Sequence, residues 1–97
     1  MSQNMLLSDM YCTQCGRKNI PIPRKKAQQR EIGHLKNMYC IYCKKKTNMV
    51  EIRSNSNYTL EDFKLEFDLH NFNKDGTRKL SWSEFRTYIN NGGGVLE

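Results

Sequence analysis

The chemistry that this sequence offers first is metal binding by thiolates. Its four cysteines form two Cys-x-x-Cys pairs with none left over: Cys12 with Cys15, and Cys40 with Cys43. A Cys-x-x-Cys turn directs two sulfurs at one point, and two such turns complete the tetrahedral thiolate set that zinc accepts. The segment between the pairs is slightly longer than the roughly 15–20 residues of a usual zinc ribbon, which an inserted loop through residues 24–34 explains. We predict a structural Zn²⁺ ion held by all four cysteines.

Two alternatives to a metal stay open at this point, a pair of disulfides and a redox dithiol, but two matched pairs favour the metal.

Gly16 and Lys44 directly follow the two pairs, where the turn favours a residue that tolerates positive φ. His34 would bind only by displacing a cysteine. A site with four protein ligands has no open position, and the sequence shows no nucleophile–base pair, so we expect no enzyme activity.

Length and composition also favour a metal. The chain has 97 residues, of which 37% are hydrophobic, so its core is small. A metal ion or disulfide is therefore expected to stabilise the fold. No apolar run is long enough to span a membrane, and the N-terminus lacks the features of a secretory signal. We therefore expect a monomer in the cytoplasm, with no membrane partner, where thiols stay reduced.

The elements around the cysteines predict a small α+β fold, with a four-cysteine zinc-ribbon-like β module followed by a C-terminal two-helix hairpin. Residues 49–53 alternate like a strand, and Pro21 and Pro23 favour an extended segment. Two capping-box patterns begin helices, Thr59 with Asp62 and Ser81 with Glu84. The predicted divisions are a β module at 1–53, a linker at 54–57, a helical hairpin docked on the ribbon at 58–91 and a flexible tail at 92–97.

The turn between the two predicted helices resembles a calcium-binding loop at its start but not at its end. Asn71, Asn73, Asp75 and Gly76 match the first, third, fifth and sixth positions of an EF-hand loop. Arg78 then stands where an apolar residue belongs, and Trp82 where calcium needs a bidentate glutamate. We expect a polar turn that connects the helices and binds no calcium.

Charge is divided unequally along the chain, whose net charge is +6. Residues 1–57 hold 11 basic and 3 acidic residues, a net +8, and residues 58–97 hold 5 and 7, a net −2. A basic region beside tyrosines is typical of a surface that binds single-stranded nucleic acid, although it also fits a merely solvated face. The candidate contact residues are basic (Arg24, Lys25, Lys26, Lys44, Lys45), aromatic (Tyr11, Tyr39, Tyr42) and acidic (Glu61, Asp62, Glu66, Asp68).

Four segments carry a resemblance to a known family: YCTQCG, IPIPR, REIGHLK and YCIYCKKKTN, followed by the tail YTLEDFKLEFDLHNFNKDGTRK. Together they resemble small zinc-ribbon proteins of phages and prophages of Gram-positive (Firmicutes) bacteria, over roughly residues 10–88. The resemblance implies a phage origin and zinc at the four cysteines. It also makes the chain a candidate for the streptococcal-phage anti-CRISPR metalloproteins that inhibit type II-A Cas9.

The functional expectation is a zinc-binding interaction protein of a phage. It would act in the cytoplasm of the host bacterium by binding and inhibiting a protein that handles nucleic acid, with Cas9 as the expected target and hindered loading of target DNA as the mechanism. The step to Cas9 is an analogy. The alternative is a zinc-ribbon accessory of transcription or replication that binds nucleic acid directly.

Overall fold

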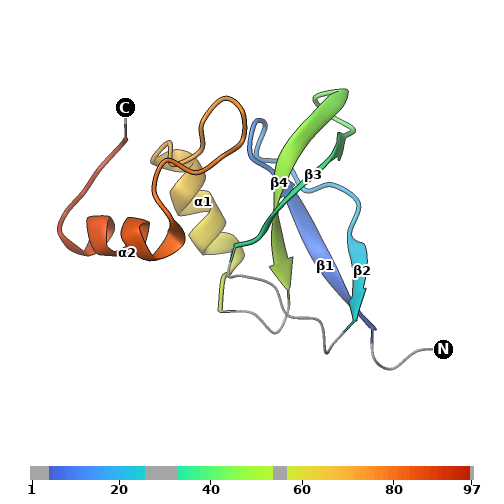
Figure 1. Ribbon diagram of the computed structural model, residues 1–97, viewed down its shortest axis with the longest axis horizontal. Helices are drawn as coiled ribbons and strands as arrows, with labels where there is room; N and C mark the ends of the chain where they lie inside the picture. Colours follow the sequence, from blue (N-terminus) through green and yellow to red (C-terminus); the bar gives the residue numbers. More distant parts are fainter. Residues whose placement is uncertain (1–4, 26–32, 54–56, 97) are drawn as a thin grey trace.

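The chain forms an antiparallel sheet of four strands followed by two helices, seen in Figure 1. The computed structural model describes residues 5–25, 33–53 and 57–96. The elements in chain order are β1 (Met5–Cys12), β2 (Ile22–Lys25), β3 (Leu35–Cys40), β4 (Lys45–Arg53), α1 (Leu60–Asp68) and α2 (Trp82–Asn90). This confirms the predicted α+β fold, with a zinc-ribbon-like β module ahead of the helices. In the described ranges, no helix has the length and hydropathy needed to cross a membrane.

The register of the sheet brings the two cysteine pairs to the same end. The strand order is β2-β1-β4-β3, and every neighbouring pair is antiparallel. Cys12 lies opposite Met49, and Cys40 lies opposite Lys45 at the start of the same strand. β2 is an edge strand. Pro23 is tolerated there because proline has no backbone N–H, and a residue on the open edge of a sheet need not donate one to a further strand.

Both faces of the sheet are covered, because successive residues of a strand point to opposite faces. Met49, Val50 and Glu51 of β4 are all buried. One face carries the cluster that surrounds the sulfurs, made of Met10, Cys12, Cys40 and Met49. The other face carries Val50, which packs with Tyr58 and Phe63 of the helical part.

α1 begins at a capping box and packs on the sheet through its aromatic side chains. The Thr59 hydroxyl accepts from the Asp62 N–H, and the Asp62 carboxylate accepts from the Thr59 N–H, as the sequence pattern predicts. Phe63 is only 2% exposed, and its ring centroid lies 5.3 Å from that of Tyr11 in β1. Figure 1 shows α1 beside β4, and burial of such rings supplies much of the packing free energy in a chain this small.

α2 extends away from the sheet, as Figure 1 shows, and its first residue, Trp82, packs against the cluster that contains Tyr58 and Phe63. It begins at a second capping box, formed by Ser81 and Glu84 as predicted. The Trp82 ring meets the buried Tyr58 edge to face, at 4.9 Å between centroids. After the helix the chain turns back, and the Leu96 N–H donates to the Leu69 carbonyl at 2.8 Å.

A buried carboxylate holds the loop between the helices. Glu66 is fully buried, and it accepts hydrogen bonds from the Arg78 guanidinium at 2.7 and 2.9 Å, from the Asn71 amide at 2.6 Å and from the Tyr58 hydroxyl. Arg78 also donates to the Gly33 carbonyl beside β3. This network fastens the loop to the sheet.

Hydrogen bonds within the loop engage two of the side chains that match the EF-hand pattern. The side chain of Asn71, at the first position of the pattern, forms hydrogen bonds with the Glu66 carboxylate and with the backbone of Leu80. The Asp75 carboxylate accepts from the Thr77 hydroxyl and N–H. Within the described residues, the group of side chains that could hold a metal is the four cysteines.

Candidate metal centre

The two Cys-x-x-Cys turns have nearly the same backbone geometry. In the first, the Gln14 N–H donates to the Cys12 sulfur at 3.3 Å and the Gly16 N–H to the Cys12 carbonyl at 2.9 Å. In the second, the Cys43 N–H donates to the Cys40 sulfur at 3.3 Å and the Lys44 N–H to the Cys40 carbonyl at 2.8 Å. Each turn therefore fixes its first sulfur with its own backbone.

Both turns end in the left-handed region, as the sequence predicts. Gly16 has φ +74° and Lys44 has φ +58°. A non-glycine residue in that region carries a steric cost between its Cβ and the backbone. Glycine avoids this steric cost in the first turn, whereas Lys44 carries it in the second.

A Gly16→Ala variant is expected to lose roughly 1–2 kcal/mol of unfolding free energy, the cost of a Cβ in this backbone region. The new Cβ would also lie 3.1 Å from the Phe67 ring, which would have to shift by a few tenths of an ångström. Urea titration of the metal-loaded protein measures the loss. The matched control is Lys44→Gly at the equivalent position of the other turn, which should be no less stable than the wild type. Equal stability of Gly16→Ala and wild type would contradict this account.

The four sulfurs are close enough to share one metal ion. They all lie within 4.8 Å of one another, and two distances between the turns are 3.8 Å for Cys12 to Cys43 and 3.7 Å for Cys15 to Cys40. In a tetrahedral site with metal–sulfur bonds of about 2.3 Å, neighbouring sulfurs are about 3.8 Å apart. The thiols are free rather than joined in disulfides, so the arrangement fits a tetrathiolate metal site.

Local hydrogen bonds distinguish the thiols from one another. Burial raises the pKa of Cys40, but the N–H groups of Cys43 and Tyr42 and the side chain of Asn19 outweigh it and lower that pKa to about 6. Burial and the neighbouring thiols raise the pKa of Cys43 to about 12, and burial also raises that of Cys15. A metal cation favours the thiolate form of all its ligands, so metal binding releases protons here.

Two polar residues around the sulfurs were not identified from the sequence. The Thr47 hydroxyl lies 3.1 Å from the Cys12 sulfur. The Asn19 amide lies 3.5 Å from the Cys40 sulfur, and its carbonyl accepts from the Ile41 N–H at 3.0 Å. Asn19 thereby joins the segment after the first turn to the second turn. No sequence signal marks either residue, since each contacts a cysteine that is distant in the sequence: Thr47 of β4 contacts Cys12, and Asn19 contacts Cys40.

Arg24, predicted in a basic contact surface, is instead part of a largely buried ion pair. Its guanidinium donates to both carboxylate oxygens of Glu51, at 3.0 and 3.1 Å, and its side chain is only 12% exposed. The Ser8 hydroxyl donates to the same carboxylate at 2.7 Å. The prediction that Arg24 is available to a partner is therefore wrong, because β2 pairs with β1 and directs it across the sheet.

The Arg24–Glu51 pair should make stability fall at acid pH. Burial raises the pKa of Glu51, but the bonds from Arg24 and Ser8 outweigh it and hold the pKa below the usual range of a glutamate. The pair therefore stabilises the fold above the unfolded-state pKa and loses this contribution as pH falls through the folded-state value. A Glu51→Gln variant should be less stable than wild type at neutral pH, and the difference should shrink below about pH 4. The measurement is urea titration of both proteins at each pH, and a difference independent of pH would contradict the prediction.

The other predicted basic residues divide between exposed and undescribed ones. Lys44, Lys45 and Lys46 are exposed at the metal end of the sheet. Lys26 and the side chain of Lys25 lie outside the described residues. Among the tyrosines, Tyr39 is 56% exposed and Tyr42 is 47% exposed, whereas Tyr11 packs on Phe63 in the core.

One of the four acidic residues predicted to contact a partner is not on the surface. Glu66 is fully buried in the network with Arg78, so its assignment to a partner-binding surface is wrong. Its position on the inner face of α1 follows from helical periodicity with Phe63, three residues earlier. Asp62 is used in the capping box, and Glu61 and Asp68 are exposed.

Comparison with protein-family models, curated proteins and solved structures found no match. The assignment of chemistry to this chain therefore rests on its own residues.

Proposed function

We propose that this protein is a binding module held together by a metal ion, and not a catalyst. One observation carries the proposal: four thiols from two turns lie within 4.8 Å of one another. Four protein ligands complete a tetrahedral shell and leave no open position for a substrate. The bound metal would supply folding free energy, as it does in small metal-dependent domains.

Zn²⁺ is the metal that we propose for this site. A tetrahedral set of four sulfur ligands is typical of zinc or of iron in sulfur-rich sites, and zinc accepts it without redox chemistry. Native mass spectrometry and elemental analysis of protein purified in reductant should find one zinc per chain. Protein that remains folded without metal, or a mass four hydrogens lower from two disulfides, would overturn the proposal.

For the partner, we propose first a host protein that handles nucleic acid, inhibited by this module in the cytoplasm of the infected bacterium. The resemblance to phage zinc-ribbon proteins supports this choice, and its specific form is an anti-CRISPR protein that hinders loading of target DNA by type II-A Cas9. The exposed acidic residues Glu61 and Asp68 offer charge complementarity to the basic surfaces with which such proteins hold nucleic acid.

The test is capture of a protein from nuclease-treated lysate of a CRISPR-bearing Gram-positive host by the metal-loaded protein. A single large protein retained at moderate salt supports the proposal, and Cas9 as that protein identifies the target. Glu61→Lys should weaken capture without disturbing the capping box, whereas Lys64→Glu, on the same helix, serves as the control. Capture that disappears whenever nucleic acid is removed would contradict a direct protein partner.

A second candidate function is direct binding of nucleic acid, as an accessory of transcription or replication. It is favoured by the metal end of the sheet, where Lys44, Lys45 and Lys46 are exposed beside the half-exposed rings of Tyr39 and Tyr42. Lysines that contact the backbone and rings that stack on bases are the usual means of binding single strands. Binding of this kind weakens steeply with salt.

A further inference from the structure

Two adjoining hollows lie where the first cysteine turn meets the loop between the helices. The larger, about 340 Å³, is lined by aromatic and polar side chains that include Phe67, His70 and Phe72. The smaller, about 140 Å³, is lined by three lysines, Lys45, Lys46 and Lys74. Both hollows include Gln14 and Lys74 in their walls, so they adjoin, and we call the pair the loop groove.

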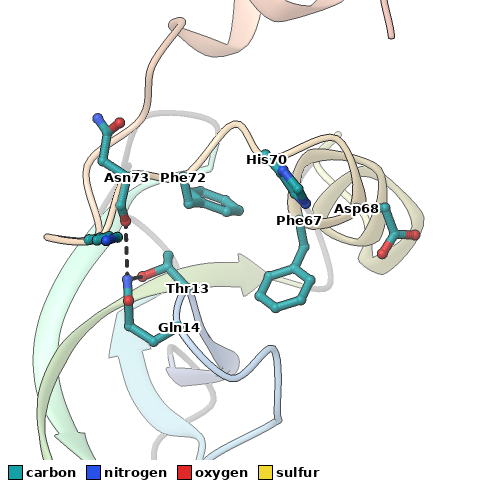
Figure 2. A pocket seen from close by; sticks show the side chains of 8 residues that line it. Thr13, Gln14, Phe67, Asp68, His70, Phe72 and Asn73 are labelled. Carbon is teal, nitrogen blue, oxygen red and sulfur yellow. Dashed lines mark hydrogen bonds between the residues drawn. The ribbon is translucent and has the colours of Figure 1, made fainter. Parts of the chain in front are cut away.

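The wall of the loop groove is held by contacts to the first cysteine turn. The Gln14 amide donates to the Asn73 carbonyl at 3.2 Å and to the Thr13 hydroxyl at 3.3 Å, as Figure 2 shows. Thr13 in turn donates from its hydroxyl and its N–H to the Asn48 carbonyl, at 2.8 and 3.0 Å. Gly76 packs so closely on Asn48 that an added Cβ would lie 2.6 Å from the Asn48 side chain. The groove is therefore formed before any ligand arrives.

One end of the loop groove presents aromatic rings. In Figure 2 the Phe67 and Phe72 side chains project into the space between the loop and the turn. Both rings are partly buried, so their positions are set by packing, and each keeps some surface open to the hollow. His70 stands at the same end with φ +62°. Aromatic side chains of this kind are the surfaces on which nucleobases stack.

The other end of the loop groove presents positive charge. Lys45, Lys46 and Lys74 are exposed there. Tyr39 lies opposite Lys46 across the β3–β4 pair, and opposed residues of a strand pair share a face, which places an exposed ring beside Lys46. Two carboxylates near the groove partly offset the positive charge of these lysines. Asp75 lies at this end, bonded to Thr77, and Asp68 lies at the aromatic end.

We propose that the loop groove binds a nucleotide unit, with the base against Phe67 and Phe72 and the phosphate at Lys45, Lys46 and Lys74. The charge balance favours this orientation, because three lysines outweigh Asp75 at one end, whereas Asp68 faces Lys74 alone at the aromatic end. The unit is either a free nucleotide or one link of a single strand, since both offer a base joined to a phosphate. This inference rests on the second candidate function, direct binding of nucleic acid, and assigns that binding to the loop groove.

The test uses the metal-loaded full chain and a fluorescein-labelled oligothymidylate in a fluorescence anisotropy titration. The double variant Lys46→Glu/Lys74→Glu should weaken binding at least about tenfold at low salt, and it should flatten the salt dependence, whose slope is about −0.7 per phosphate contact. Phe72→Leu keeps an apolar side chain but removes the ring, and should weaken binding about tenfold. Lys64→Glu, outside the groove, is the matched control. Tyr42→Ala, also outside the groove, tests the wider surface at the metal end of the sheet, and urea titration of each variant verifies its fold.

Unlabelled thymidine monophosphate distinguishes the two sources of the nucleotide. Displacement of the strand by the monophosphate supports a site for one free nucleotide, and strand binding without displacement supports a single-strand groove. Strand binding that is lost in Tyr42→Ala but not in the groove variants would overturn the groove and leave the second candidate function standing. Absence of strand binding at low salt would contradict both the groove and the second candidate function.

Discussion

A Cys40→Ser variant is expected to lose its metal and the cooperative fold of the β module. Cys40 is fully buried, and its sulfur accepts from the backbone of the second turn. A serine hydroxyl does not ionise to replace that thiolate. Metal binding in small zinc domains contributes roughly 10–16 kcal/mol, which equals or exceeds the whole stability of most small domains. Elemental analysis should find less than one metal per chain, and NMR should show collapsed amide dispersion for residues 10–53.

The matched control for this variant is Tyr42→Ser, which introduces the same side chain two positions along the same turn. Tyr42 is 47% exposed and provides no sulfur. Its ring lies under the Arg17 guanidinium at 4.9 Å, an exposed contact worth only about 0.5–1 kcal/mol. Tyr42→Ser should keep one metal and the native spectrum. A Cys40→Ser protein that is folded and free of metal would overturn the structural role of the site.

Each half of the candidate metal centre was predictable because its information is local. A Cys-x-x-Cys turn contains its own geometry, and the positive φ at Gly16 and Lys44 follows from closing that turn. The same holds for the two helix starts, where Thr59 and Ser81 cap the residues that immediately follow them. Short-range patterns of this kind need no knowledge of which strands pair.

The charged residues were less predictable, because their partners are distant in the sequence. Arg24 and Glu51 meet only when β1 lies between β2 and β4. Glu66 meets Arg78 only when the loop folds back over α1. The sequence alone predicts Glu66 to be a surface charge, since buried glutamate is rare unless it is paired. The loop groove has the same origin, because it joins the turn at Gln14 to the loop at Lys74.

Glu66→Gln is expected to cost about 3 kcal/mol of unfolding free energy, within the range for breaking a buried ion pair. Burial lowers the pKa of Arg78, but Glu66 outweighs it and raises that pKa, so the guanidinium stays charged. An amide at position 66 leaves this charge buried without a counter-ion. The indole of Trp82 contacts Tyr58, a member of the same network, so its fluorescence in a urea titration reports the loss.

Two further variants separate the ion pair from general effects of charge. Asp9→Asn removes the carboxylate of an exposed pair with Lys18, whose side chains are 43% and 52% exposed, and should cost less than about 1 kcal/mol. Glu66→Gln/Arg78→Met removes both charges and should recover part of the stability lost in Glu66→Gln, because no uncompensated charge remains buried. If Glu66→Gln were as stable as Asp9→Asn, the network would not be what holds the loop, and the loop groove would then have to depend on the Gln14 and Gly76 contacts alone.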